Sequence, residues 1–255
     1  MALTPSRAVS AALAVASSLD LPADDPVVLK DGSNVLVWLR PAPVVARVGG
    51  VTAFVREDVH AHFTRADSLS RYLASRGVPV VEPLGAPTRH GAHVVALASR
   101  VEKLEWTPTV SWFCGFLRDL HAELRDYPGA LPARGPLDDV DACLDLLGRP
   151  ADLVDRREGL VARWPDEQAQ PLHGDPHPAN VLMTPSGPVW NDFEDAWRGP
   201  VGWDVASAAL HRSLDREAMF ADYPAAPFWA DLRTLLVDCW RAADDLYRTR
   251  TLPAG

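Results

Sequence analysis

The sequence predicts an α+β protein with two unequal lobes, and three observations support this fold class. The first third of the 255 residues is rich in short β-type runs, whereas the remainder mostly has the apolar spacing of helices. A chain of this length suffices for one large domain or two small lobes. No internal repeat and no low-complexity linker interrupts it. We therefore expect a small β-rich N-lobe and a larger, mostly helical C-lobe.

The composition is that of a globular protein, and it excludes several functional classes. Hydrophobic residues make up 47% and charged residues 23%, which excludes a disordered chain. The formal net charge of −9 argues against a nucleic-acid partner. No apolar run approaches the roughly 20 residues of a membrane helix, so no membrane association is expected. Three scattered cysteines favour a reducing, cytoplasmic location over a disulfide framework.

The N-terminal third predicts helices around a small sheet. Residues 5–19 have amphipathic spacing, which favours a helix over a short signal peptide. Turn residues at 31–34 and 41–43 divide the following stretch into short apolar runs, as in a three-stranded meander. The expected strands are 27–29, 35–39 and 44–48, followed by a helix over 59–76 that ends at Gly77 and by β-rich runs at 78–81 and 93–97.

The C-terminal part predicts helices around a central loop and hairpin. Residues 128–255 contain 21 acidic and 12 basic residues, whereas residues 1–127 contain 13 of each. This excess of acids indicates either a solvated surface or a half that attracts a cationic ligand. The loop-and-hairpin stretch runs from Pro171 to Arg198, and the expected helices are about 109–125, 137–148, 151–164, 203–213 and 227–248.

The stretch His173-Gly-Asp-Pro-His-Pro-Ala-Asn180 contains most of the chemistry in the sequence. An apolar strand follows it, a turn comes at 184–187, and a return strand ends at Asn191-Asp192-Phe-Glu-Asp. A two-stranded ribbon of this length brings Asp192 back beside Asn180 and Asp175. Two carboxylates and one amide are therefore expected to converge at one end of the ribbon.

This arrangement suits phosphoryl transfer from a nucleotide. The reaction needs a carboxylate that orients and deprotonates the attacking hydroxyl, and hard oxygen ligands for Mg²⁺. Asp175 fits the base, whereas Asn180 and Asp192 fit the metal ligands. The spacing of five between Asp175 and Asn180 equals that of the kinase catalytic loop, and Asp192 follows at a distance typical of a hairpin.

At these residues the sequence resembles the aminoglycoside phosphotransferases and related small-molecule kinases, which share the protein-kinase-like fold. Almost the whole chain takes part in the resemblance. It rests on three segments, His173–Asn180, Asn191–Asp195 and Gly199–Ala206, and on weaker matches at 31–35, 44–48 and 117–121. The resemblance implies a bilobal protein-kinase-like fold, with an N-lobe at 1–99, a hinge at 100–104 and a C-lobe at 105–255.

The resemblance also implies roles for individual residues. The turn containing Ser33 and Asn34 would cover the nucleotide phosphates, and the hinge near Arg100 and Val101 would contact the base. Arg47 stands where the family has a phosphate-binding Lys, and it keeps the positive charge. The remaining implied residues are Asp67, the nearest candidate for the helix acid that pairs with this base, and His173 and Asp204, which would organise the catalytic loop.

The predicted function is ATP- or GTP-dependent and Mg²⁺-dependent phosphorylation of a hydroxyl on a small molecule, acting as a monomer or homodimer. The usual family substrate is an aminoglycoside antibiotic, which would imply a role in resistance. A cationic substrate would contact acids of the C-lobe: Glu194, Asp195, Asp244 and Asp245. Two alternatives stay open. One is a nucleotide-binding pseudokinase, and the other is a metal-dependent hydrolase that uses His177 with the neighbouring acids.

Overall fold

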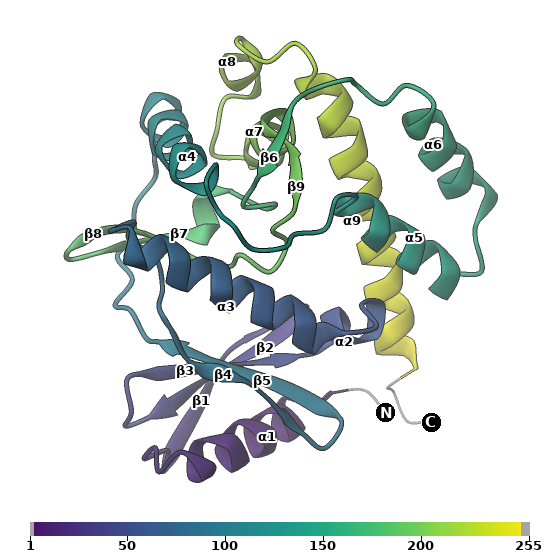
Figure 1. Cartoon of the computed structure of the whole chain (residues 1–255). Helices are drawn as coiled ribbons and strands as arrows, with labels where there is room; N and C mark the ends of the chain where they lie inside the picture. Colours follow the sequence, from purple (N-terminus) through teal and green to yellow (C-terminus); the bar gives the residue numbers. More distant parts are fainter. Residues whose placement is uncertain (1–2, 251–255) are drawn as a thin grey trace.

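The computed structural model describes residues 3–250, in which a small β-rich lobe lies beside a larger helical lobe (Figure 1). The N-lobe holds a five-stranded antiparallel sheet in the order β1-β2-β3-β5-β4. The predicted meander is therefore confirmed. The strands are β1 (Asp25–Asp31), β2 (Asn34–Arg40), β3 (Val44–Gly49), β4 (Pro83–His90) and β5 (His93–Ser99).

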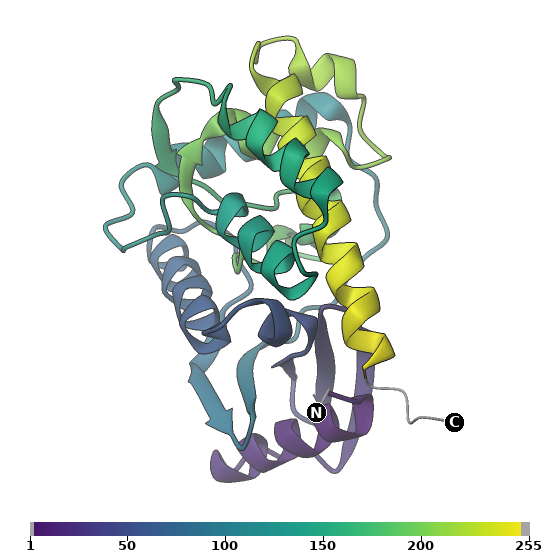
Figure 2. The same ribbon diagram turned by 90° about the vertical axis from the view of Figure 1, so that its right-hand side faces the viewer.

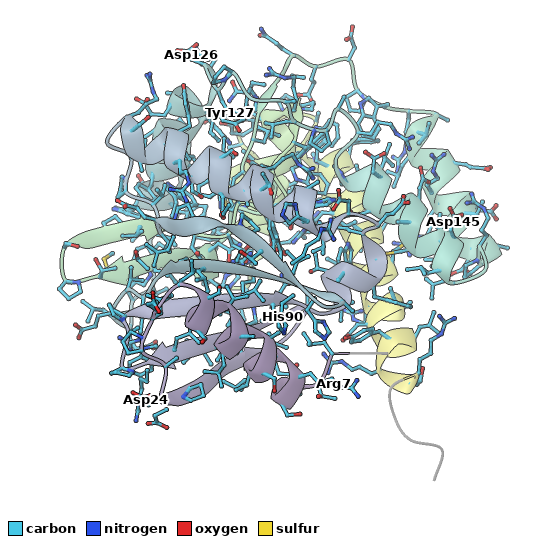
Figure 3. The ribbon with its side chains drawn as sticks, turned by 60° about the horizontal axis from the view of Figure 1, so that its bottom comes forward. Arg7, Asp24, His90, Asp126, Tyr127 and Asp145 are labelled. Carbon is cyan, nitrogen blue, oxygen red and sulfur yellow. The ribbon has the colours of Figure 1, made fainter. Side chains whose placement is uncertain are left out.

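Alternation along the central strands decides which side chains face the outer helix and which face the other lobe. Helix α1 (Pro5–Ser18) packs on the outer face of the sheet (Figure 3). The strand side chains that point toward this helix, such as Val37 and Val48, form an apolar core with it. Because successive residues of a strand point to opposite faces, Leu36 and its cross-strand partner Arg47 face away from α1. Arg47 is thereby directed toward the C-lobe.

Two helices lie between the sheet and the C-lobe. Helix α2 (Val51–Val55) is a single short turn, and α3 (Val59–Ser75) runs across the other face of the sheet (Figure 1). The carboxylate of Asp58 accepts a hydrogen bond from the backbone nitrogen of Ala61 (3.2 Å), so Asp58 caps the N-terminus of α3. The predicted helix over 59–76 is confirmed.

The structure corrects the sequence prediction in several segments. Residues 78–81 form no strand of their own, because only Val80 makes a bridge, to Trp190. The edge strand β4 was not predicted, since its prolines, its glycine and a register shift hide the period-two pattern. The short helices α2 and α8 (Arg216–Phe220) were also missed, and the helix expected over 203–213 spans only Val201–Ala209, which is α7.

The C-lobe is mostly helical and has two apolar cores. The long helix α9 (Ala226–Thr249) runs from the far end of this lobe to the N-lobe (Figure 2). It packs on α5, α6 and α7 in one core, while α4, the end of α3 and the hairpin form the other. The remaining elements are α4 (Val110–Leu124), α5 (Pro136–Leu146), α6 (Ala151–Val161), β6 (Ala169–Pro171), η1 (Pro178–Asn180), β7 (Val181–Thr184), β8 (Gly187–Trp190) and β9 (Arg198–Pro200).

None of the helices within residues 3–250 is both long enough and apolar enough to cross a membrane.

Candidate active site

The β7–β8 hairpin brings together the three residues that the sequence singles out. Val181 pairs with Trp190 at its open end, and the backbone nitrogen of Asn191 donates to the carbonyl of Asn180 (2.9 Å). The side-chain amide of Asn180 donates to the backbone carbonyl of Asp175 (2.9 Å). Asp175, Asn180 and Asp192 therefore lie at one end of the hairpin, as the ribbon argument predicts.

A buried carboxylate holds the loop that contains Asp175. Asp204, on α7, is fully buried and accepts hydrogen bonds from the backbone nitrogens of His173 (3.1 Å) and Gly174 (2.9 Å). It also contacts the imidazole of His121 (2.9 Å), from α4. Trp203 donates to the carbonyl of Gly174 (2.7 Å). The loop is thus fixed at successive backbone groups, and this agrees with the organising role expected for Asp204.

His173 is buried and connects the loop to the hairpin. Its Nε2 contacts the backbone oxygen of Asn191 (3.1 Å), and its Nδ1 accepts from the backbone nitrogen of Asp175 (3.3 Å). Burial lowers the pKa of His173, with nearby carboxylates opposing the shift. A neutral imidazole with both nitrogens engaged positions the loop and does not exchange protons with a ligand.

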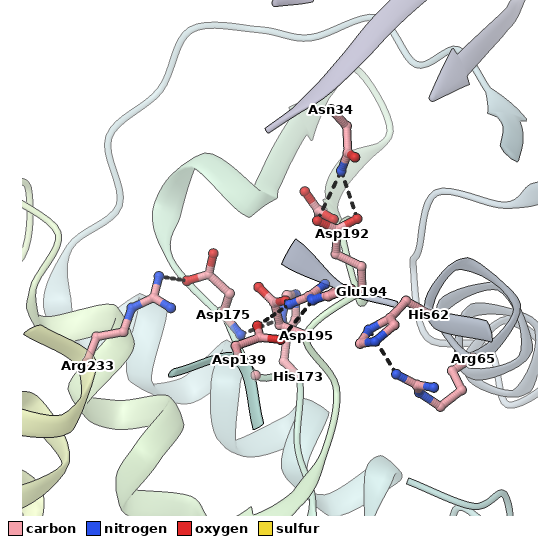
Figure 4. A network of polar contacts seen from close by, with 12 residues as sticks. Asn34, His62, Arg65, Asp139, His173, Asp175, Asp192, Glu194, Asp195 and Arg233 are labelled. Carbon is pink, nitrogen blue, oxygen red and sulfur yellow. Dashed lines mark hydrogen bonds and ion pairs between the residues drawn. The ribbon is translucent and has the colours of Figure 1, made fainter. Parts of the chain in front are cut away.

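Asp175 makes an ion pair that the sequence did not predict. Arg233 of α9 donates to Oδ1 of Asp175 (2.6 Å), as Figure 4 shows. Nε2 of His177 lies 3.5 Å from Oδ2 of the same carboxylate. Burial would raise the pKa of Asp175, but Arg233 and His177 outweigh it and hold this pKa well below its usual value. Asp175 is therefore an ionised carboxylate, as an acceptor of a hydroxyl proton must be.

Arg47 bridges two acids that follow the hairpin. Its Nη1 donates to Asp192 (2.5 Å) and to Glu194 (2.9 Å). Asn34, at the start of β2, donates through its side-chain amide to both oxygens of Glu194, at 3.1 and 2.9 Å (Figure 4). Burial would lower the pKa of Arg47, but the two carboxylates raise it above its ordinary value. The N-lobe is thus connected to the end of the hairpin by charge.

Glu194 and Asp192 have unusual local environments. Burial, with the neighbouring charge of Asp192, raises the pKa of Glu194 to about 7 although Arg47 opposes the shift. Asp192 has a φ of 69°, in the left-handed region that non-glycine residues seldom adopt. Such strain is typical of sites where the backbone is held in place to aim a side chain.

Asp67, proposed as the partner of Arg47, makes no ion pair with it among the described residues. Its Oδ2 is buried and has no hydrogen-bond partner, and burial raises its pKa to about 6. The expected pairing is therefore wrong in this conformation. The acids that pair with Arg47 come from the end of the hairpin and not from α3.

Arg56 forms a second charged link between the lobes, one that sequence reasoning missed. This buried residue follows α2, and it donates through Nε (3.0 Å) and Nη2 (2.6 Å) to Asp139 of α5. It also contacts Asp195. Asp139 is 83 positions further along the chain. No local pattern marks such a partner.

Arg233 could have been found from helix spacing. It follows the buried Trp229 by four residues and precedes Leu236 by three, so it lies on the face of α9 that packs inward. A cation on an otherwise apolar helix face indicates a buried partner or a ligand.

The other predicted site residues lie as follows. The backbone oxygen of Ser33 accepts from the nitrogen of Thr52 (3.1 Å), so the turn before β2 rests on α2. Arg100 stacks over Trp38 of β2, with 3.9 Å between its Cζ and the ring centroid, and Val101 follows in the segment between the lobes. Both positions border the face of the sheet that lies opposite α1.

Asp244 and Asp245 lie far along α9 from the catalytic loop. At about 1.5 Å per residue, Asp244 is about 16 Å along the helix axis from Arg233. Asp244 pairs with Arg248 (2.9 Å), one turn further along α9. The structure therefore does not bring these two acids to Asp175, in contrast to the sequence prediction. Glu194 and Asp195 do lie at the site, but arginines of the chain already bind them.

A cavity of about 200 Å³ adjoins the catalytic loop, and we name it the α3–α9 cavity after the helices at its two ends. It extends from the beginning of α3 past the loop before α5 to α9. Its lining residues are His62, Arg65, Pro132, Gly135, Pro136, Asp138, Asp139, Gly174, Glu194, Asp195, Ala196, Trp197, Trp203, Arg233 and Leu236.

Among residues 3–250, no group of three or more His, Cys, Asp and Glu side chains is disposed to hold a metal ion. The donors at the hairpin are instead one amide and one carboxylate. The amide nitrogen of Asn180 is used by the backbone of Asp175, so its oxygen is left for another partner. Such a pair fits Mg²⁺, which prefers hard oxygen ligands and takes the others from phosphates and water.

Comparison with solved structures shows the fold. The choline kinase LicA from Streptococcus pneumoniae has a TM-score of 0.69 at 14% identity, covering 97% of this chain and 93% of its own. An aminoglycoside-3'-phosphotransferase of type VIII has a TM-score of 0.67 at 17% identity, covering 91% and 98%. An amicoumacin kinase in complex with AMP-PNP and Ca²⁺ has a TM-score of 0.60 at 13% identity, covering 90% and 77%.

A search of the curated proteins gave no match. The sequence model described as "Phosphotransferase enzyme family" matches residues 30–243, a stretch that runs from the end of β1 almost to the end of α9. The kinase-like fold, the loop held by Asp204 and the matched residues all lead to one assignment. The chain belongs to this phosphotransferase family.

Proposed function

We propose that this protein transfers the γ-phosphoryl group of ATP or GTP, with Mg²⁺, to a hydroxyl group of a small molecule. The observation that supports the proposal most directly is the meeting of Asp175, Asn180 and Asp192 at one end of the hairpin. Arg47 and Asn34 of the N-lobe face them. Nucleotide phosphates need cations and amides on one side and metal-binding oxygens on the other, and this pairing supplies both.

In this proposal Asp175 accepts the proton of the attacking hydroxyl. Its pKa is held low, so its main contribution is to orient the hydroxyl and to receive the proton late in the reaction. Oδ1 is bonded to Arg233, and Oδ2 lies toward His177 at the longer distance of 3.5 Å. The oxygen that contacts the hydroxyl is therefore expected to be Oδ2.

Arg47 is the proposed phosphate-binding base. A single nitrogen of its side chain bridges Asp192 and Glu194, so phosphate oxygens would replace or share these acids. Asn180 and Asp192 would hold Mg²⁺, which would supply positive charge against the phosphates. The segment 100–104 is proposed as the hinge that contacts the base, between lobes at 1–99 and 105–255.

The neighbours support this assignment without deciding the substrate. The amicoumacin kinase was solved with AMP-PNP and Ca²⁺, which is consistent with a nucleotide and a divalent metal here. The other neighbours are named for choline and for aminoglycosides. An aminoglycoside acceptor, and with it a role in antibiotic resistance, is therefore one candidate among several small molecules.

The test measures nucleoside diphosphate release with ATP or GTP, with Mg²⁺ or with EDTA, against a panel of acceptors. The panel contains kanamycin, choline, homoserine, a macrolide and amino sugars. We expect turnover that requires Mg²⁺ and one acceptor, and Asp175→Asn should lower it about 10²- to 10⁴-fold. Asp155→Asn, at an exposed position of α6, is the matched control and should keep full activity.

The two alternatives predict other results. Nucleotide binding by calorimetry without turnover on any acceptor would indicate a pseudokinase. Metal-dependent hydrolysis of an ester or a phosphate in the absence of nucleotide would indicate a hydrolase. Either result would overturn the proposal.

A further inference from the structure

Arg65 of α3 is a cation without a carboxylate in the wall of the α3–α9 cavity. Its Nη2 donates to Nδ1 of His62 (2.9 Å), while its Nε is buried and has no hydrogen-bond partner (Figure 4). Within residues 3–250 it makes no ion pair. Burial and the nearby charge of Arg56 lower the pKa of Arg65, yet an arginine stays protonated at any working pH.

His62 does not compensate this charge. Burial, together with Arg56 and Arg65, lowers the pKa of His62 to about 3. The ring is therefore neutral near pH 7, and its Nδ1 serves only as an acceptor for Arg65. A half-buried guanidinium with only a neutral partner is costly unless an anion occupies the space beside it.

The carboxylates of the cavity wall are already bound to other cations. Arg56 holds Asp139 and Asp195. Glu194 is held by Arg47. The fourth acid of the wall, Asp138, lies 3.5 Å from the guanidinium of Arg134, on the exposed side. Asp139, together with Asp58 outside the wall, opposes the fall in the pKa of Arg65, but within residues 3–250 neither acid makes an ion pair with it.

A second buried donor in the same wall has no partner. The indole nitrogen of Trp197 is buried without a hydrogen bond, whereas those of Trp203 and Trp229 donate to the carbonyl of Gly174 and to Glu167 (2.7 Å each). Buried indole nitrogens usually find an acceptor. Trp197 is therefore a second residue of this wall whose buried donor has no partner among residues 3–250.

The opposite end of the cavity holds a second arginine, which is paired with Asp175. Arg233 lies there beside Asp175, and Figure 4 shows Arg233 and Arg65 on opposite sides of the group formed by Asp139 and Asp195. A cationic ligand would meet an arginine at each end. A molecule with an anionic group at the Arg65 end can present a hydroxyl to Asp175 at the other end.

From these contacts we propose that the substrate is a hydroxylated organic anion, a carboxylate or a phosphate monoester, whose anionic group binds Arg65. This inference rests on the proposed kinase function and names its substrate class. The apolar surfaces of Trp203, Leu236 and Pro136 would contact the carbon skeleton between the two ends. Arg233 disfavours a cation next to Asp175.

The test uses four probes with one carbon scaffold: glucose, glucosamine, gluconate and glucose 6-phosphate. Their shifts of the melting temperature are measured without nucleotide at constant ionic strength. We expect gluconate or glucose 6-phosphate to stabilise the protein, and the comparison of these two separates a carboxylate site from a phosphate site. Glucose and glucosamine should have little effect. Nucleotide turnover with Mg²⁺ is then measured with each probe, with kanamycin and choline as cationic acceptors.

The variants locate the effect. Arg65→Gln should weaken binding of the anionic probe by about tenfold or more, because a charged hydrogen bond is lost. Arg65→Lys should retain part of the affinity. Arg71→Gln removes an exposed arginine from the same helix and should behave as wild type. Each variant's melting temperature without probe shows whether it is folded.

The outcomes separate this inference from the proposed function. If neither anion binds, or if Arg65→Gln binds it as wild type does, the anion site is wrong. Turnover of a neutral or cationic acceptor in preference to the anions would also overturn it, while leaving the kinase function intact. Anion binding that depends on Arg65, without turnover of any acceptor, would support the anion site but overturn the kinase function.

Discussion

Asp67 and Arg47 are both half-buried charges, but of the two only Arg47 makes ion pairs within residues 3–250. Arg47 faces Asp192 and Glu194, while one oxygen of Asp67 has no hydrogen-bond partner. Arg47 and Asp67, which stand at the positions of a kinase ion pair, are therefore expected to contribute to stability independently of each other. Each can be tested by substitution.

For Asp67 the expected effect is on stability as a function of pH. Burial raises its pKa from 3.8 to about 6, with Arg71 and Arg47 opposing the shift. The folded state therefore binds the proton of Asp67 more tightly than the unfolded state does. Protonated Asp67 stabilises the fold below pH 4, and this contribution is lost as the pH rises through 6. The increase in the free energy of unfolding of Asp67→Asn over wild type should be about 1 kcal/mol larger at pH 8 than at pH 5.

The measurement is the free energy of unfolding in urea at the two pH values. Asp155→Asn, which removes an exposed acid, should show no such difference. If the gain of Asp67→Asn were the same at both pH values, the pKa of Asp67 would not be raised.

For Arg47 the expected effect is on nucleotide affinity and on coupling with Glu194. Arg47→Ala should raise the KM for the nucleotide, whereas Arg47→Lys should keep substantial activity because one nitrogen makes both contacts. In unfolding experiments, Arg47→Ala and Glu194→Gln should couple by about 1–3 kcal/mol. The matched cycle of Arg47→Ala with Asp67→Asn should be additive within about 0.5 kcal/mol. Additivity in both cycles would contradict the pairing seen here.

The catalytic loop is an element whose shape depends on one glycine. Gly174 has a φ of 91°, and a Cβ placed there would lie 1.9 Å from the backbone oxygen of Asp195. The loop therefore passes so close to the segment after the hairpin that no side chain fits.

Gly174→Ala should consequently destabilise the protein by about 2 kcal/mol or more and lower turnover, since the loop or the segment must move. The control is Gly159→Ala, at a helical position of α6 where a Cβ meets nothing within 4 Å. That change should stabilise by about 0.5–1 kcal/mol. Thermal unfolding and turnover of both variants check the prediction, and a Gly174→Ala protein with wild-type values would refute it.

At the scale of the whole molecule, ion pairs as well as apolar contacts join the two lobes. Arg56 connects the N-lobe to α5 and to Asp195, and its guanidinium lies 5.3 Å from the ring of Trp240. The end of α9 also reaches the N-lobe, where Phe54 and Tyr247 have ring centroids 5.4 Å apart. The relative placement of the lobes thus depends on a few long-range contacts.

Arg56→Met should cost about 3–5 kcal/mol in unfolding free energy, because Asp139 and Asp195 are left buried without a cation. Arg76→Met breaks an exposed pair with Glu123 and should cost at most about 1 kcal/mol. Adding Asp139→Asn to Arg56→Met should recover part of the loss. Similar costs for the two arginine variants would mean that the Arg56 link contributes no more than a surface pair.

The sequence by itself determined the features that local patterns encode. Turn residues between short apolar runs predicted the meander, and the turn at 184–187 between two apolar strands predicted the hairpin that gathers Asp175, Asn180 and Asp192. These features follow from backbone hydrogen bonding over a few residues, so spacing alone reveals them. The short helix α2 and the edge strand β4 were not predicted, because the pattern of α2 is too short and that of β4 is interrupted by proline and glycine.

The tertiary structure alone decided which charges meet. Arg56 reaches Asp139 across 83 positions and Arg233 reaches Asp175 across 58, whereas Asp67, the nearest acid in the family pattern, is left without an ion pair to Arg47. The same packing leaves Arg65 in the wall of the α3–α9 cavity without an ion pair to any residue of 3–250. The free energy of such a contact depends on burial and on every neighbouring charge, and these are known only once the helices and the sheet have packed.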